Sequence, residues 1–166
     1  MDRVSAYLAL RQLLRLPEHR HQARAAEAIM EALAQHLGQP PDDWAMMGLL
    51  LHLDVELAEH NPSARGRIAR QQAEAEGLAP ALAEALQRCW TEADAAAPLE
   101  DALPLAAWLA EHRHASNLGE QLELRLGHGD PLGHRIDQGL QRLGLSSQQA
   151  AALATAALSD FAEPRR

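Results

Sequence analysis

The sequence predicts an all-α protein that folds as one compact domain of about seven to nine helices. Apolar residues make up 47% of the 166 residues, but aromatic residues only 3%, so Leu and Ala must build most of the core. Both are strong helix formers, whereas the β-branched residues that favour strands are scarce. The length suits a single hydrophobic core. Apolar residues that recur at helical spacing then place the individual helices.

The first third of the chain predicts three helices. Apolar residues recur at helical spacing from Val4 to Leu16, and Pro17 ends or kinks that helix. A second helix is expected from His19 to His36, with a stop at Gly38. The third begins at residues 39–43, where Pro and Asp suit a first helical turn. Because residues 44–51 are apolar on nearly all sides, we interpret this helix as the buried central one.

The remaining helices are separated by Pro, Gly and polar turns. Asn61 or Ser63 is expected to cap a helix over 64–76. Helices over 81–90 and 99–114 follow, with an acidic connector at 92–98 between them. After a loop at 127–131 a helix covers 132–143, and Ser146 caps a last helix from 148 to about 161. We expect residues 163–166 to fray.

Charge and cysteine content narrow the classes of function. The formal net charge is −8, and a negative surface disfavours binding to nucleic acid. The single cysteine, Cys89, has no partner in the chain for a disulfide. The first residues lack the apolar run of a signal peptide, and no stretch approaches the ~20 apolar residues of a membrane span. We therefore expect a cytoplasmic protein that contacts neither nucleic acid nor membrane.

Several segments form a recognisable framework: EAIMEALA at 27–34, Trp44, GLLLHLDVE at 48–56 and PSARG at 62–66. This framework resembles bacterial HD-domain proteins of the metal-dependent phosphohydrolase superfamily. The resemblance covers about residues 17–115 and implies an HD-like helical core there. Helices in 116–162 would then pack on that core within a single domain of residues 1–166.

The resemblance also locates the metal ligands of the family, and this chain has other residues there. They are Gln22, Leu51, His52, Arg65 and Trp108. In HD enzymes His and Asp hold one or two metals that activate water for attack on phosphorus. Leu51 has no lone pair to offer, Trp108 has no carboxylate, and Arg65 brings a positive charge. The resemblance thus implies a vestigial pocket in which no metal or other cofactor is expected.

A rearranged ligand set is the alternative for this pocket. His21, His60 and His112, together with His52 and Asp54, are the candidate ligands. His52 and Asp54 are two residues apart, which on a helix is roughly 200° of rotation. They would point to opposite sides and could not replace adjacent ligands unless the helix ends between them. Surface or partly buried histidines with hydrogen-bond partners are the simpler interpretation.

Other charged residues also have a structural and a functional interpretation. Asp54 and Glu56 could be a carboxylate pair for acid–base chemistry, but we favour a role in capping the chain after the central helix. Arg67 and Arg70 share one face of a predicted helix. They could bind phosphate, although a solvated face that pairs with Glu74 is favoured.

Two functions follow from these observations. The first is a non-enzymatic HD-like binding or regulatory module, which binds a protein partner or a small phosphate-bearing ligand in the vestigial pocket. The alternative is an HD-type metal-dependent phosphohydrolase with a rearranged ligand set and a divalent metal. The apolar last helix would also allow a homodimer.

Overall fold

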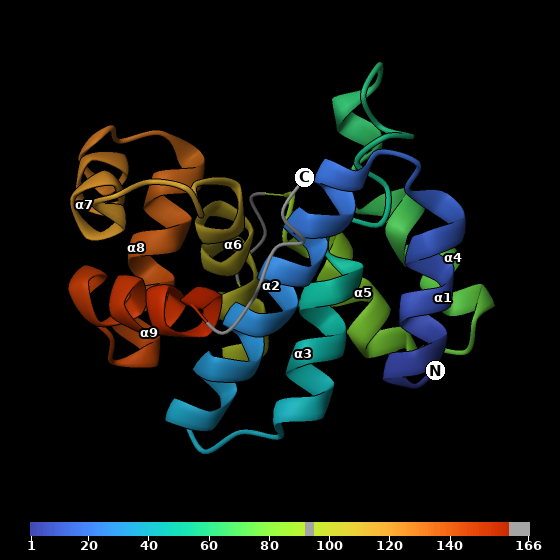
Figure 1. Ribbon diagram of the computed structural model, residues 1–166, viewed down its shortest axis with the longest axis horizontal. Helices are drawn as coiled ribbons and strands as arrows, with labels where there is room; N and C mark the ends of the chain where they lie inside the picture. The colour runs from blue at the N-terminus through green and yellow to red at the C-terminus, as the bar shows by residue number, and fades with distance from the viewer. Residues whose placement is uncertain (92–94, 160–166) are drawn as a thin grey trace.

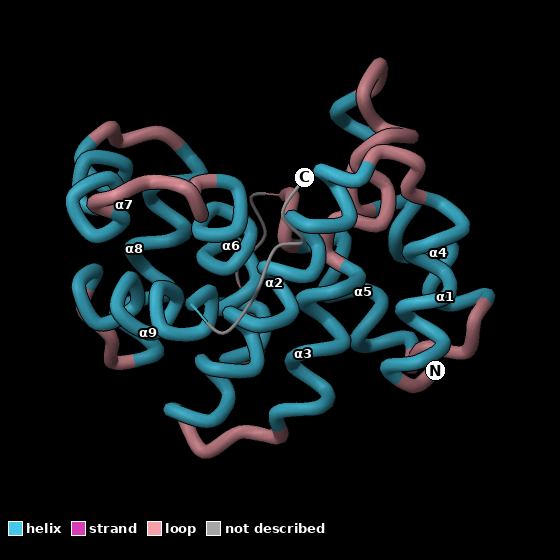
Figure 2. The backbone as a smooth tube through the Cα atoms, viewed as in Figure 1, coloured by secondary structure: helices cyan, strands magenta, loops and turns pink. Residues whose placement is uncertain are grey.

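The all-α prediction is confirmed. A computed structural model of the chain describes residues 1–91 and 95–159, which form nine α-helices, a short 3-10 helix and no strand (Figures 1 and 2). The helices of the first half are α1 (Arg3–Leu13), α2 (Pro17–His36), α3 (Pro41–Leu50), η1 (Pro62–Ala64), α4 (Arg67–Ala75) and α5 (Pro80–Arg88). Those of the second half are α6 (Pro98–Glu111), α7 (Leu118–Gly127), α8 (Pro131–Leu143) and α9 (Ser147–Ser159).

Helices α2, α3 and α6 form the centre of the molecule. In Figure 1, α7, α8 and α9 lie to one side of this centre, and α1 and α4 lie to the other. Helix α2 packs on α3, α6 and α9. Residues 44–50 of α3 are all buried, as its apolar sequence predicts. Gly48 permits the close approach of α3 to α2, because a Cβ there would lie 2.5 Å from the carbonyl oxygen of Ala26.

Helix α1 buries a narrower face than its apolar content suggests. Ala6, Ala9 and Leu10 face the core, whereas Val4 and Leu8 are 69% and 54% exposed. The helix lies at the edge of the molecule, where it packs chiefly on α3 (Figure 1). Helical spacing therefore located α1, but it did not distinguish the buried apolar residues from the exposed ones.

The C-terminal helices follow the predicted turns. Ser146 caps α9 as expected: its Oγ accepts a hydrogen bond from the Gln149 amide at 3.1 Å, and the Gln149 side chain accepts one from the Ser146 amide at 2.9 Å. Arg142 of α8 donates both Nε and Nη2 to the carboxylate of Asp101, which joins α8 to α6. Residues 92–94 of the acidic connector, the predicted end of the last helix at 160–161 and the tail at 163–166 lie outside the described residues.

Two local predictions are corrected. Helix α7 was not predicted at all. The proposed cap of α4 by Asn61 or Ser63 is wrong, because residues 62–64 form η1 and the Ser63 hydroxyl donates to Asn61 instead. Helix α4 starts only at Arg67, after Arg65 has adopted an extended conformation. In the described part of the chain, no helix has both the length and the apolar character that a membrane span needs.

Candidate functional site

The segment after α3 carries the buried polar residues of the site. Helix α3 ends at Leu50, and residues 51–60 continue as turns. His52 and Asp54 are both fully buried within this segment. Because α3 ends before both of them, the helical spacing assumed for this pair does not apply. Each contacts the segment 65–69, His52 through a side chain and Asp54 through backbone amides.

Asp54 caps α4 from outside that helix. Its Oδ2 accepts hydrogen bonds from the amides of Gly66 at 2.8 Å and Ala69 at 3.0 Å. These amides belong to the N-cap and the third residue of α4, which have no partner within the helix. Burial raises the pKa of Asp54, although the two amides and the charge of Arg65 oppose that shift. The role of Asp54 is thus structural, because it pairs the amides at the start of α4.

Glu56 has the same role at the start of α2. Its carboxylate accepts hydrogen bonds from the amides of Arg15 at 3.0 Å and Leu16 at 2.8 Å. The His19 ring contacts the same carboxylate at 3.2 Å. Burial raises the pKa of Glu56, but the two amides and His19 outweigh it, so the net effect lowers the pKa. The two carboxylates therefore cap two different helices.

Arg65 lies between His52 and Trp90. Its Nη2 donates to His52 Nδ1 at 3.1 Å, and its Cζ lies 3.6 Å from the centroid of the Trp90 ring. His52 meets Trp90 in an edge arrangement, with ring centroids 6.2 Å apart and planes at 64°. A cation stacked on an indole in this way gains electrostatic attraction from the ring face. We call His52, Arg65 and Trp90 the buried triad, although only His52 is fully buried and the other two are half-buried.

Gly66 allows the segment of Arg65 to lie against the end of α5. Its φ of +77° is in the region that favours glycine. A Cβ at this position would lie 2.7 Å from Trp90 Cδ1 and 2.9 Å from the Gln87 Cα atom. Arg65 can therefore reach across Trp90 only because the next residue has no side chain.

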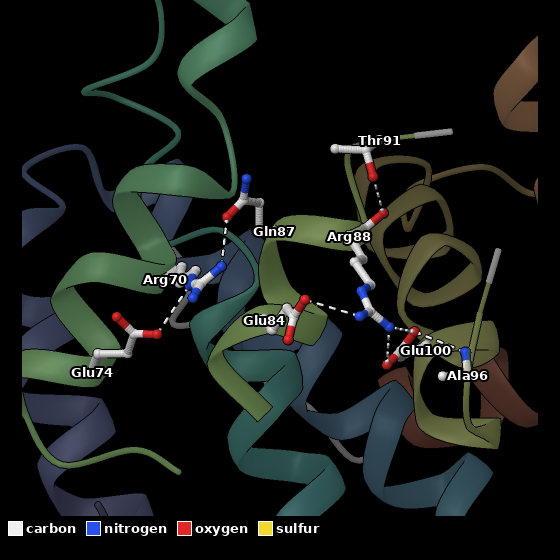
Figure 3. Close-up of polar contacts among 8 residues, drawn as sticks. All are labelled: Arg70, Glu74, Glu84, Gln87, Arg88, Thr91, Ala96 and Glu100. Atoms are coloured by element: carbon white, nitrogen blue, oxygen red, sulfur yellow. Dashed lines mark hydrogen bonds and ion pairs between the residues drawn. The ribbon is translucent and has the colours of Figure 1, made fainter. Parts of the chain in front are cut away.

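Polar contacts from three helices hold α5, which positions Trp90. Arg70 of α4 donates to Gln87 at 3.2 Å, and Arg88 contacts Glu100 of α6 (Figure 3). Arg135 of α8 donates to the carbonyls of Arg88 at 2.7 Å and Cys89 at 2.9 Å, and also to that of Thr91. The end of α5 is thus tied to α4, α6 and α8.

The surroundings of His52 favour the neutral form of its ring. Burial of the ring, with the positive charges of Arg65, His19 and Arg113, lowers the pKa of His52 well below its usual value. A neutral imidazole has one donor nitrogen and one acceptor nitrogen, and guanidinium offers no acceptor. Nδ1, which faces Arg65, must therefore accept. It follows that Nε2 carries the hydrogen and is a donor.

The triad holds three buried donor groups without an acceptor among the described residues. They are His52 Nε2, Arg65 Nε and Trp90 Nε1. Oδ1 of Asp54, an acceptor, is also buried without a partner there. An unpaired buried donor costs about 1–3 kcal/mol. Three N–H groups in one cluster are therefore suited to a ligand that presents oxygen acceptors.

The other three positions predicted for the vestigial pocket are Leu51, Gln22 and Trp108. Leu51 is fully buried in the core, and Gln22 is buried on α2. Trp108 is buried on α6 and stacks on His112, with ring centroids 4.1 Å apart. Trp108 and His112 line a cavity of about 420 Å³ between α6, α7 and α8. The structure thus brings His52 and Arg65 into direct contact, and Trp90 joins them.

The candidate ligands of a rearranged metal site are dispersed. His21 lies in a cleft beside α1, His60 is exposed, and the His112 Nδ1 contacts the carbonyl of Trp108. Within residues 1–91 and 95–159, no three His, Cys, Asp or Glu side chains are grouped so that they could hold a metal ion. Arg70 pairs with Glu74 at 2.9 Å, as the favoured interpretation of that helix face predicted.

Trp90 is the site residue that the sequence did not indicate. It lies just after α5 and 25 positions from Arg65, and no motif links the two. Only the packing of α4 on α5 brings them together.

No protein-family model, curated protein or solved structure matches the chain. The site therefore has to be interpreted from its own geometry.

Proposed function

We propose that this chain is a non-enzymatic binding module on an HD-like scaffold, and that the buried triad binds a ligand with carboxylate-type oxygens. The observation that carries the proposal is the group of unpaired donors on His52, Arg65 and Trp90. Arg65 supplies positive charge, the neutral His52 supplies an N–H, and Trp90 supplies a donor with no acceptor capacity. All three groups donate, so the site favours oxygen acceptors.

The same residues argue against a metal at this place. By the resemblance to HD-domain proteins, Arg65 takes the position of a metal-binding His. A guanidinium in a buried site repels a divalent cation and offers it no lone pair. The nitrogen of His52 that is free of Arg65 carries a hydrogen, so it is not ready to ligate either. A binding function is therefore favoured over a phosphohydrolase with a rearranged site.

Titration of the protein with acetate, followed by the indole N–H signals in NMR, tests the ligand class. We expect the Trp90 signal to shift, because its Nε1 would gain an acceptor, while the Trp44 signal stays in place as an internal control. Arg65→Lys keeps the charge but lacks Nε–H and the planar fork. Its acetate affinity should fall by about tenfold, which corresponds to about 1.4 kcal/mol. Equal shifts of all indoles, or an unchanged affinity of Arg65→Lys, would contradict the proposed ligand site.

Elemental analysis of the purified protein tests the non-enzymatic part separately. The proposal expects no stoichiometric divalent metal and no hydrolysis of nucleotide phosphates in the presence of added Mn²⁺. A tightly bound metal in a one-to-one ratio, with phosphatase activity, would support the phosphohydrolase instead. Arg65→Lys should leave this result unchanged, since the residue is not expected to hold a metal.

A further inference from the structure

Helix α1 presents an apolar and basic stripe to solvent. Val4, Tyr7 and Leu8 are 69%, 38% and 54% exposed, and their spacing of three or four residues places them on one side of the helix. Arg11 follows one turn after Tyr7 and is also exposed. Between residues of the described part of the chain, no hydrogen bond or ion pair involves its side chain. We call Val4, Tyr7, Leu8 and Arg11 the α1 stripe.

The outer face of α7 has the opposite charge and is hollowed. A hollow of about 610 Å³ is lined by Glu120, Glu123, Leu124, Gly127 and His128. Leu124 is 61% exposed. Both carboxylates are exposed, and within residues 1–91 and 95–159 they accept hydrogen bonds only from neutral side chains. Their negative charges are therefore not balanced by an ion pair in this part of the chain. We call this surface the α7 hollow.

Gly127 keeps the α7 hollow open without serving the fold of its own chain. It lacks the positive φ of Gly129, the glycine two residues later. A Cβ at Gly127 would meet no atom within 4 Å, so no close packing requires a glycine there. Glycine makes a helix less stable than alanine does, because a more flexible backbone has to be ordered. The space beside Leu124 thus costs α7 some stability and is available to a side chain from another molecule.

The α1 stripe and the α7 hollow match in charge and in spacing. Tyr7 and Arg11 are four residues apart on α1, and Glu123 and Gly127 are four residues apart on α7. If the two helices pack antiparallel, Tyr7 lies over Gly127 while Arg11 lies opposite Glu123. The aromatic ring then covers the position without a side chain, and the guanidinium pairs with the carboxylate. Parallel packing would instead place Tyr7 against the carboxylate and Arg11 over the glycine.

The two surfaces cannot meet within one molecule, because α1 and α7 lie at its opposite ends (Figure 1). We propose that the α1 stripe of one copy docks antiparallel into the α7 hollow of a second copy. The net charge of −8 opposes non-specific association, so the contact depends on this local match of charge and shape. Because the two surfaces differ, the contact is head-to-tail and builds open chains or rings. It uses neither the last helix nor the buried triad, so it does not depend on the function proposed above.

Analytical ultracentrifugation at rising protein concentration tests the proposal. A contact through one helix of each copy is small, so we expect association between about 10 μM and 1 mM. Arg11→Glu and Glu123→Arg should each raise the dissociation constant at least about tenfold, because each places like charges opposite each other. Arg67→Glu is the matched control: it makes the same change of charge at an exposed position on α4 and should alter the constant less than about twofold.

A mixture of the two charge variants tests the pairing itself. Arg11→Glu and Glu123→Arg should associate when combined, because every contact between the two kinds of copy again joins opposite charges. Arg11→Glu makes the chain more negative and Glu123→Arg makes it less negative, so overall charge cannot explain a loss in both singles and a recovery in the mixture.

Gly127→Gln tests the shape of the hollow apart from its charge. The new side chain should prevent association while the thermal midpoint stays the same or rises, since Gln is the better helix former and the space is open. Three results would overturn the proposal. They are a monomer at every concentration up to about 1 mM, a loss in Arg11→Glu that Glu123→Arg does not share, and undiminished association of Gly127→Gln.

Discussion

Replacement of Asp54 by Ala is the sharpest test of how the site is built. The change leaves the amides of Gly66 and Ala69 without an acceptor in a buried setting. An unpaired buried group costs about 1–3 kcal/mol, so two of them cost about 2–6 kcal/mol. This range lies above the ~1 kcal/mol typical of a lost N-cap, because both residues that lose their acceptor are buried. A small domain is stable by only about 5–15 kcal/mol, so Asp54→Ala should fold marginally.

Urea unfolding followed by circular dichroism measures this cost. Asp54→Asn retains one carbonyl acceptor, so we expect it to lose clearly less than Asp54→Ala. Glu59→Ala is the matched control, because Glu59 is an exposed carboxylate in the same turn segment and should change stability by no more than about 0.5 kcal/mol. If Asp54→Ala lies within about 1 kcal/mol of the unchanged protein, the capping role assigned to Asp54 is refuted.

The same residue predicts the sign of a pH effect. Burial raises the pKa of Asp54 above its ordinary value of 3.8 in the folded state, so the folded protein binds this proton more tightly than the unfolded chain. The contribution to stability is full below pH 3.8 and is lost as the pH rises through the folded-state pKa. Asp54→Asn lacks this step. The unchanged protein should therefore lose stability relative to Asp54→Asn as the pH rises, and a difference that is constant with pH would contradict the shift.

Three further predictions concern single positions. Glu56→Gln should lower stability at pH 7 by about 1–2 kcal/mol through weaker capping of α2. Because the pKa of Glu56 is lowered from 4.5 in the folded state, this loss should shrink as the pH falls below 4.5, which urea unfolding at several pH values can follow. Burial raises the pKa of Cys89 to about 12, so the thiol should react with a disulfide reagent only after unfolding, as measured by absorbance; fast labelling of the native protein would contradict its burial. Gly48→Ala should cost about 1–3 kcal/mol despite the better helix propensity of Ala, because its Cβ would meet the Ala26 carbonyl; a rise in the thermal midpoint would show that α2 and α3 can move apart.

Local signals predicted the helices that depend on local chemistry. The stop at Gly38 follows from its positive φ of 66°, and the cap by Ser146 follows from a residue pattern at the start of a helix. The central helix was recognisable because residues 44–50 are apolar on every side. In each case the deciding interaction lies within about five residues, so it is visible in the sequence.

Interactions between distant segments were not predictable in this way. The cap of α4 comes from Asp54, 12 residues before Gly66, so the nearby Asn61 and Ser63 were better candidates by sequence distance alone. Helix α7 buries only Leu118 and Leu122, which leaves a weak apolar pattern. The approach of Trp90 to Arg65 depends on how α4 packs on α5. The sequence thus indicated two residues of the triad, His52 and Arg65, whereas packing adds Trp90.

The two carboxylates of the turn after α3 also connect segments that are far apart in the sequence. Asp54 protects the amide of Ala69, and Glu56 protects that of Leu16. If the turn opens as a unit, both amides become exposed to solvent at once. Their hydrogen exchange should then report the same opening free energy, although 53 positions separate them in the sequence. One short turn would in this way set the local stability of two helix starts.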